Sequence, residues 1–317
     1  MMWAGRPVEA AALFTFALET AQAAGNTYSI LQSYGNLVDH LLTSDTPSAL
    51  DRAFEGVAQA KRLGNRNALQ TLLSNQWLGL LFAGRWQEIE EQTRTQLHEQ
   101  DFGDVHVRLA LLRAWQGDLT AATDEVELTR SEFSDTNLQD REILGAAHAT
   151  VLHALGRPQE AIDAARPVLD YDAGIRREAY RVALPAAVEA ALELGQVDEA
   201  ELMLSRILGR GPGDAPPFLR AQLTRFRARV RWARGDHGRD VESDLRSVVA
   251  QLEDLGYPYW AALARYDLAV VLADAGEDGA ADREAAKVLE IASSLGAAPL
   301  LGKAQSLRDR LPATVTA

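Results

Sequence analysis

The sequence predicts an all-α fold in which antiparallel helix hairpins stack side by side as an α-solenoid. The first observation is a recurring phrase, a glycine or serine elbow followed five residues later by alanine in most copies. Successive elbows lie 39, 40, 33, 39, 39, 40 and 41 residues apart, and a fixed period of this size is typical of solenoids. The elbows are Gly5, Ser44, Gly84, Gly117, Gly156, Gly195, Gly235 and Gly276.

Two further observations support the same fold. Apolar residues such as Leu144, Ala147 and Val151 recur at steps of three and four, which places them on one face of a helix. A second set of glycines follows the elbows at 20 or 21 residues, where the second helix of each hairpin is expected to end. This set consists of Gly25, Gly64, Gly256 and Gly296.

Each elbow separates two helices, here named helix A before it and helix B after it. Glycine at the elbow adopts the left-handed backbone conformation that ends helix A without a steric penalty. Proline suits the first turn of helix B, and an aspartate there caps its positive end. These residues are Pro7, Pro47 and Pro158, and Asp118, Asp236 and Asp278. The alanines that follow at position five are Ala10, Ala49, Ala122, Ala161, Ala200 and Ala281, where we expect helices A and B to cross closely.

These signals predict seven hairpins within a single solenoid domain, residues 1–311. The hairpins are 28–64, 67–100, 104–133, 138–171, 174–210, 216–256 and 258–296. A lone helix B, 7–24, precedes them, and a last helix, 299–311, covers the apolar end of the stack. The segment 209–217 is rich in glycine and proline and predicts a joint, whereas residues 312–317 are expected to be a disordered tail.

Two positions leave alternatives open. Pro185 falls inside a helix A, so that helix either kinks there or a new helix begins.

The first residues of the chain resemble the end of a helix A. Trp3 lies two residues before the Gly5 elbow, just as Trp115 lies two residues before Gly117, so residues 1–4 look like the tail of a helix A. This favours a chain excised from a longer protein, and a mis-assigned start codon is the alternative.

Composition excludes several classes of function. The net charge of −13 and the pI near 5.0 argue against binding of nucleic acid or of an anionic membrane surface. The absence of cysteine excludes disulfides and zinc sites built on cysteine, and it fits a cytoplasmic protein. No apolar run is long enough to span a membrane. Residues 10–23 also suit a signal peptide, but Glu9 and Glu19 flank the apolar stretch and favour the repeat helix.

The elbow phrase Gly-x-x-x-Glu-Ala, as in residues 156–161, resembles the tetratricopeptide repeat. The longer period of about 39–40 residues is similar to the C-terminal helical region of MalT-like transcription activators and of ATPase-linked adenylate cyclases. The closing stretch 289–299 also resembles the end of those regions. The resemblance covers nearly the whole chain and implies a right-handed α-solenoid that acts as the sensor or scaffold part of a regulator.

Motifs for catalysis and for cofactors are missing. There is no phosphate-binding Gly-x-x-x-x-Gly-Lys-Ser/Thr, no metal-binding aspartate pair on strands and no Gly-x-Ser-x-Gly elbow. His148 and His153 are five residues apart and do not share a helix face as a ligand pair would. The sequence therefore predicts no enzyme, no cofactor and no metal site.

One basic helix provides the candidate binding site. Residues 216–234 carry six arginines in an otherwise acidic chain. The tetratricopeptide pattern implies that Gln222, Arg225, Arg229 and Trp232 face the groove, where arginine can hold a carboxylate or phosphate. The alternative, which the acidic composition favours, is that these arginines pair with Glu189, Glu193 and Asp267 on neighbouring helices. The candidate binding residues are Gln222, Arg225, Arg229, Trp232, Tyr266 and Glu189.

The aromatic residues raise the same choice. Trp77, Trp86 and Trp115 and the cluster 257–266 could stack on a ligand, but core packing is the favoured interpretation.

The leading functional hypothesis is a scaffold that binds a protein or peptide segment, including one from the same parent polypeptide, in its concave surface. The alternative is a sensor domain in which a small-molecule inducer closes the superhelix. The sequence indicates neither the partner nor the oligomeric state.

Overall fold

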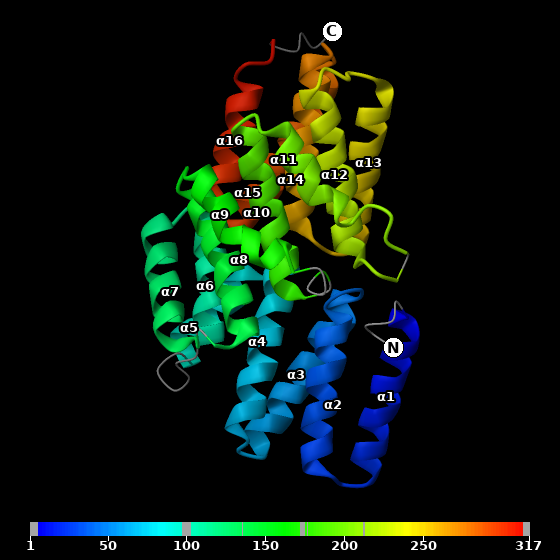
Figure 1. Ribbon diagram of the computed structural model, residues 1–317, viewed down its shortest axis with the longest axis vertical. Helices are drawn as coiled ribbons and strands as arrows, with labels where there is room; N and C mark the ends of the chain where they lie inside the picture. The colour runs from blue at the N-terminus through cyan, green and yellow to red at the C-terminus, as the bar shows by residue number, and fades with distance from the viewer. Residues whose placement is uncertain are drawn as a thin grey trace.

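The described part of the protein is entirely helical. The computed structural model describes residues 6–96, 103–134, 136–171, 175, 177–211 and 213–312. Within those ranges the chain forms sixteen α-helices and no strand, which confirms the predicted fold class (Figure 1). The helices are α1 Pro7–Ala23, α2 Thr27–Leu41, α3 Thr46–Arg62, α4 Arg66–Phe82, α5 Trp86–Gln96, α6 Gly103–Gln116, α7 Leu119–Glu132, α8 Leu138–Ala154, α9 Pro158–Leu169, α10 Glu178–Glu193, α11 Val197–Ser205, α12 Pro217–Ala233, α13 Arg239–Asp254, α14 Pro258–Asp274, α15 Asp278–Leu295 and α16 Ala298–Arg308.

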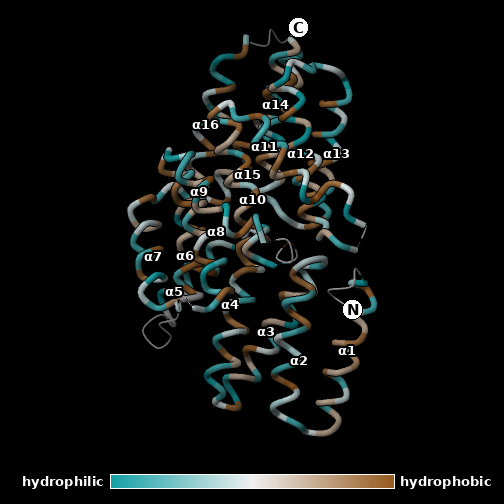
Figure 2. Tube along the Cα trace, in the orientation of Figure 1, coloured by the Kyte–Doolittle hydropathy of each residue, from teal (hydrophilic) through white to brown (hydrophobic). Residues whose placement is uncertain are grey.

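The helices pair as predicted. The seven hairpins run from α2–α3 to α14–α15, the lone helix B is α1, and α16 closes the stack. Even-numbered helices are helices A, and each packs on the next helix A as well as on its own helix B. From α1 the chain passes through α2–α7 and returns through α8–α11 to α12–α16 (Figure 1). Apolar and polar stretches alternate along most helices (Figure 2), as expected where each helix buries one side.

The elbows have the expected local structure. Every described elbow glycine has a positive φ, for example 69° at Gly84 and 71° at Gly156. The six alanines at position five are at most 3% exposed. Asp118 caps α7 by accepting a hydrogen bond from the Ala121 backbone at 3.1 Å. Asp278 instead begins α15, where Glu277 occupies the cap position without a side-chain hydrogen bond.

The superhelix curls until late repeats touch early ones. The Thr46 and Tyr257 hydroxyls form a hydrogen bond of 2.8 Å across 211 residues, and Arg181 donates to the Leu42 carbonyl at 2.7 Å. Helix α16 also packs against α6. The A helices therefore surround a shared interior, and the side chains directed into it come from distant parts of the sequence.

The remaining predictions about the chain have mixed outcomes. Pro185 lies within one continuous helix, α10, so no new helix begins there. The predicted joint 209–217 connects α11 to α12, and Arg220 donates to the Ala215 carbonyl within it. Residues 1–5 and 313–317, which include Trp3 and most of the predicted tail, lie outside the described residues. Among the helices of the described ranges, none is both long and apolar enough to cross a bilayer.

Replacement of Gly84 by alanine tests the curled packing. A Cβ atom at Gly84 would lie 2.5 Å from Pro258 Cγ and 2.9 Å from Leu295 Cδ2, whereas at Gly156 it would meet nothing within 4 Å. Both changes cost roughly 1–2 kcal/mol because alanine disfavours positive φ. Gly84→Ala should cost about 1–3 kcal/mol more, because the elbow is overpacked. Equal free energies of unfolding in urea for the two variants would contradict the close contact of the Gly84 elbow with Pro258 and Leu295.

Candidate functional site

The inner helices enclose a groove that we call the central groove. It has a volume of about 360 Å³ and receives side chains from α6, α8, α10, α12, α14 and α16. One representative from each helix, in that order, is Trp115, His153, Glu189, Arg229, Tyr266 and Lys303. Apart from Gly156 at the elbow after α8, the lining residues lie on helices A, as the solenoid predicts for a concave surface.

A cluster of four charges forms one wall of the groove. Arg225 donates through Nη2 to Glu189 Oε1 at 2.7 Å and through Nε to Asp267 Oδ2 at 2.6 Å. Arg229 also pairs with Glu189, and its Nε lies 3.6 Å from Asp267 Oδ1. These contacts confirm the alternative in which the arginines pair with acids on neighbouring helices for Glu189 and Asp267, whereas Glu193 pairs with His153. They join three consecutive A helices, α10, α12 and α14, through side chains alone.

The charges in this cluster stabilise one another. Burial alone would raise the pKa of Glu189, but the Arg229 and Arg225 guanidinium groups outweigh it and hold that pKa far below its usual 4.5. Burial also opposes the charge on Arg229, yet Asp267 and Glu189 raise the pKa of Arg229 above its usual value. Because the folded-state pKa of Glu189 is the lower one, its stabilisation is present above about pH 4.5 and is lost only in strong acid.

The two arginines differ in what they offer a ligand. The Arg225 side chain is 1% exposed and already pairs with two carboxylates, so it holds the wall in place. The Arg229 side chain is 23% exposed, and it lines the groove together with Tyr266 and the exposed Lys303. One turn after Glu189 on α10, Glu193 also lines the groove, and its Oε1 lies 3.1 Å from His153 Nε2. The open part of the groove therefore presents an arginine, a lysine, the His153–Glu193 pair and aromatic rings.

Four of the six candidate residues meet in the central groove, and two lie elsewhere. Glu189, Arg225, Arg229 and Tyr266 line it. Gln222 is fully buried one turn before Arg225 and accepts a hydrogen bond from Arg225 Nη1 at 3.4 Å. Trp232 packs near the end of α12, with its ring centroid 4.0 Å from that of His237.

Buried aromatic rings form the floor of the groove and continue into the core. Trp115 stacks on Tyr259 at 5.1 Å between ring centroids and meets Trp260 edge-on at 5.5 Å. The cluster then continues through Phe82, which lies 5.3 Å from Phe218. Core packing is thus confirmed as the main role of these rings, although Trp115, Tyr259 and Trp260 also line the groove.

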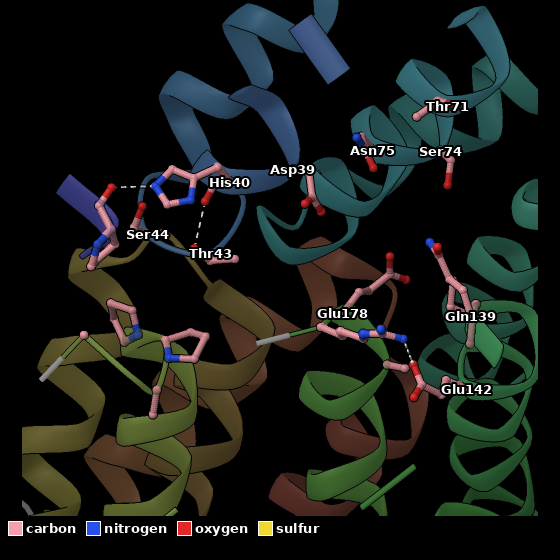
Figure 3. A pocket seen from close by; sticks show the side chains of 18 of the residues that line it. Asp39, His40, Thr43, Ser44, Thr71, Ser74, Asn75, Gln139, Glu142 and Glu178 are labelled. Atoms are coloured by element: carbon pink, nitrogen blue, oxygen red, sulfur yellow. Dashed lines mark hydrogen bonds and ion pairs between the residues drawn. The ribbon is translucent and has the colours of Figure 1, made fainter. Parts of the chain in front are cut away.

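Sequence reasoning missed a second and larger space, which we call the N-terminal cavity. It has a volume of about 540 Å³ and is lined from α1, α2, α4, α6, α8, α10 and the segment before α12. Figure 3 shows polar side chains directed into it from several helices, among them Asp39, Asn75, Gln139 and Glu178. Its residues extend from Pro7 to Pro217, so no local motif could have revealed it.

Neither space contains the donor set of a metal site. Within the described residues, no group of three or more histidine, aspartate or glutamate side chains is arranged to hold a metal ion.

Comparison with known proteins adds one structural relationship. No protein-family model matches the chain, and no curated protein matches it. Among solved structures, the chain is similar to a Rap protein crystallised in complex with competence and sporulation factor. The TM-score is 0.62 at 12% sequence identity, and the alignment covers 86% of this chain and 80% of the Rap chain. At this identity the similarity shows the fold, which is a tetratricopeptide-like helical solenoid.

Removal of Arg225 tests the charge cluster. Arg225→Ala leaves Glu189 and Asp267 short of a partner in the interior, and we expect a loss of about 3–5 kcal/mol in the free energy of unfolding. Arg234→Ala is the matched control, because Arg234 is 45% exposed and pairs with Asp198 and Glu201 at the surface. That control should cost less than about 1 kcal/mol. Similar costs in urea titrations of both variants would show that the cluster does not brace the helices.

Proposed function

We propose that the chain is a non-catalytic helical-repeat scaffold that holds a segment of a protein or peptide in the central groove. The observation that supports this most strongly is the composition of the groove, to which six successive A helices each contribute side chains. A segment that filled the groove would touch side chains from all six helices. Such a surface suits recognition of an extended chain better than chemistry on a small group.

The chemistry of the groove fits the same proposal. Binding energy at protein interfaces is concentrated in a few aromatic and arginine side chains, and the groove offers Tyr266, Tyr259 and the partly exposed Arg229. The charge cluster is already satisfied internally, so its side chains are ordered before a partner arrives. A preorganised wall lowers the entropy lost on binding.

The similarity to Rap supports the proposal at the level of architecture. The Rap structure contains a second component, competence and sporulation factor, together with a solenoid of the same fold. We infer by analogy that this chain also holds a partner, and that it is the regulatory or interaction part of a larger bacterial signalling or transcription regulator in the cytoplasm. An in-frame ATP-binding motif upstream of Met1 would support the MalT-like parent, and its absence would argue against it.

A small-molecule sensor is the second candidate. The volume of about 360 Å³ lies within the range of small-molecule pockets, and an inducer that bridged α8 and α16 would tighten the superhelix. Thermal shift measurements against sugars, nucleotides and short acidic peptides separate the two hypotheses. A metabolite that raises the melting temperature supports the sensor, whereas a response to peptides alone supports the scaffold.

A substitution that fills the groove tests where the partner binds. Ala154 is half-buried on the groove wall, so Ala154→Trp should occupy the space with little damage to the core. Peptides selected on an array by the native chain should lose at least about tenfold in affinity, which corresponds to 1.4 kcal/mol. Ala17→Trp, at an exposed position of α1, is the control and should bind normally. Unchanged binding to Ala154→Trp would place the partner outside the central groove.

A further inference from the structure

The N-terminal cavity contains two ion pairs that neutralise most of its charge. Arg108 donates through Nη2 to Glu178 Oε2 at 2.8 Å and to Ser74 Oγ at 3.0 Å. Arg177 donates through Nη1 to Glu142 Oε2 at 2.7 Å. The other oxygen of Glu142, Oε1, is buried without a hydrogen-bond partner among the described residues. Both arginines are therefore paired with a glutamate of the cavity wall.

Asp39 is the remaining charge on the cavity wall. Within the described part of the chain, its carboxylate forms no hydrogen bond or ion pair, although Arg181, Glu178 and His40 act on it electrostatically. Arg181 is buried behind the wall, where it donates to the Leu42 carbonyl. Figure 3 shows Asp39 projecting from the end of α2 into the space above α10. The paired arginines and acids cancel, so Asp39 gives the cavity lining a net negative charge.

The Asp39 carboxylate is exposed to the space of the cavity. Asp39 is an exposed residue, and the lining around it comes from several helices. Partial loss of hydration there raises the pKa of Asp39, and the neighbouring Glu178 carboxylate raises it further, against Arg181 and His40. A carboxylate in this position is open to a ligand that brings the opposite charge.

The rest of the lining suits an organic cation. The side-chain amides of Asn75 and Gln139 form no hydrogen bond within the described residues, and both point toward the cavity (Figure 3). Apolar surface comes from Pro7, Ile143 and Pro216. We propose that the N-terminal cavity binds an ammonium or guanidinium group carried on a short aliphatic stem, with the Asp39 carboxylate as its counter-ion.

This chemistry occurs both in free amines and in basic peptide side chains. Calorimetry with the full chain should therefore use two kinds of probe, spermidine and agmatine as free amines and the capped peptide acetyl-Gly-Arg-Gly-amide. The same peptide with citrulline in place of arginine is the neutral counterpart. Binding of either cationic class with rejection of the citrulline peptide supports the proposal, and the class that binds identifies the source. Absence of binding by all cationic probes, or equal binding of the citrulline peptide, overturns it.

Asp39→Asn is the decisive variant. A charge-assisted hydrogen bond contributes about 1.5–3 kcal/mol, so the variant should bind the cation at least about tenfold more weakly. Asp51→Asn removes the same charge from an exposed position on α3 and should leave the affinity unchanged. Ala154→Trp fills only the central groove, so it should also leave cation binding unchanged. Loss of cation binding in that variant would assign the cation to the central groove and overturn the proposal, independently of where the protein partner binds.

The folding stability of Asp39→Asn gives a second readout. Because the pKa of Asp39 is raised in the folded state, its charged form destabilises the fold above the usual pKa of 3.8, and the effect disappears in acid. Asp39→Asn should therefore melt at the same or a higher temperature than the native chain at pH 7, with no gain near pH 3. A lower melting temperature at pH 7 would show that Asp39 is a structural residue and would overturn its assignment as a counter-ion.

The raised pKa of Asp39 also determines how cation binding should depend on pH. The charged groups around Asp39 are Glu178 and Arg181 on α10, His40 on α2, Arg108 on α6 and the Glu142–Arg177 pair. Since only the deprotonated Asp39 attracts a cation, affinity should increase as pH rises through its raised pKa. Asp39→Asn should remove that increase, and a slope that persisted in the variant would contradict Asp39 as the titrating group.

Discussion

Close packing at the elbows determines the shape of this molecule. At the described glycine elbows a left-handed residue reverses the chain, and at most elbows an alanine in helix B lets the two helices cross. At Gly84 the same glycine also admits Pro258 and Leu295 from a hairpin far along the chain. One residue type thus makes the local turn and the contact that curls the superhelix. The central groove and the N-terminal cavity both depend on that curl, because each is lined by helices from distant repeats.

The local part of the structure could be predicted from the sequence because its rules act over a few residues. Left-handed glycines, the Asp118 cap and the buried alanines are all set within one hairpin. The contact between Thr46 and Tyr257 could not be predicted, since it spans 211 residues and depends on small rotations accumulated over several repeats. The N-terminal cavity was missed for the same reason. Asp39, Glu142 and Glu178 form no motif in the sequence and come together only when the stack curls.

The central groove was predictable in outline and not in detail. An excess of arginine on one helix of an acidic chain indicated that carboxylates would lie opposite, and Glu189 and Asp267 do so. Arg225 and Arg229 are one helical turn apart on α12, and only Arg229 stays partly exposed to the groove. This difference depends on how deeply each side chain is buried between the neighbouring helices. Gln222 was placed in the groove by the repeat pattern, but the same turn directs it into the core beside Arg225. Such distinctions require the packing of three helices to be known.

The two spaces differ in how they treat charge, and this difference argues for different ligands. In the central groove, the two arginines of the charge cluster face two carboxylates, so the cluster is neutral and attracts no ion at a distance. Affinity there must come from short-range contacts with rings and aliphatic stems, which favours an extended partner. In the N-terminal cavity, the pairs Arg108–Glu178 and Arg177–Glu142 cancel, and Asp39 is left without a partner of its own. The Asp39 carboxylate is exposed to the space of a cavity of about 540 Å³, so a cation that entered the cavity could pair with it directly.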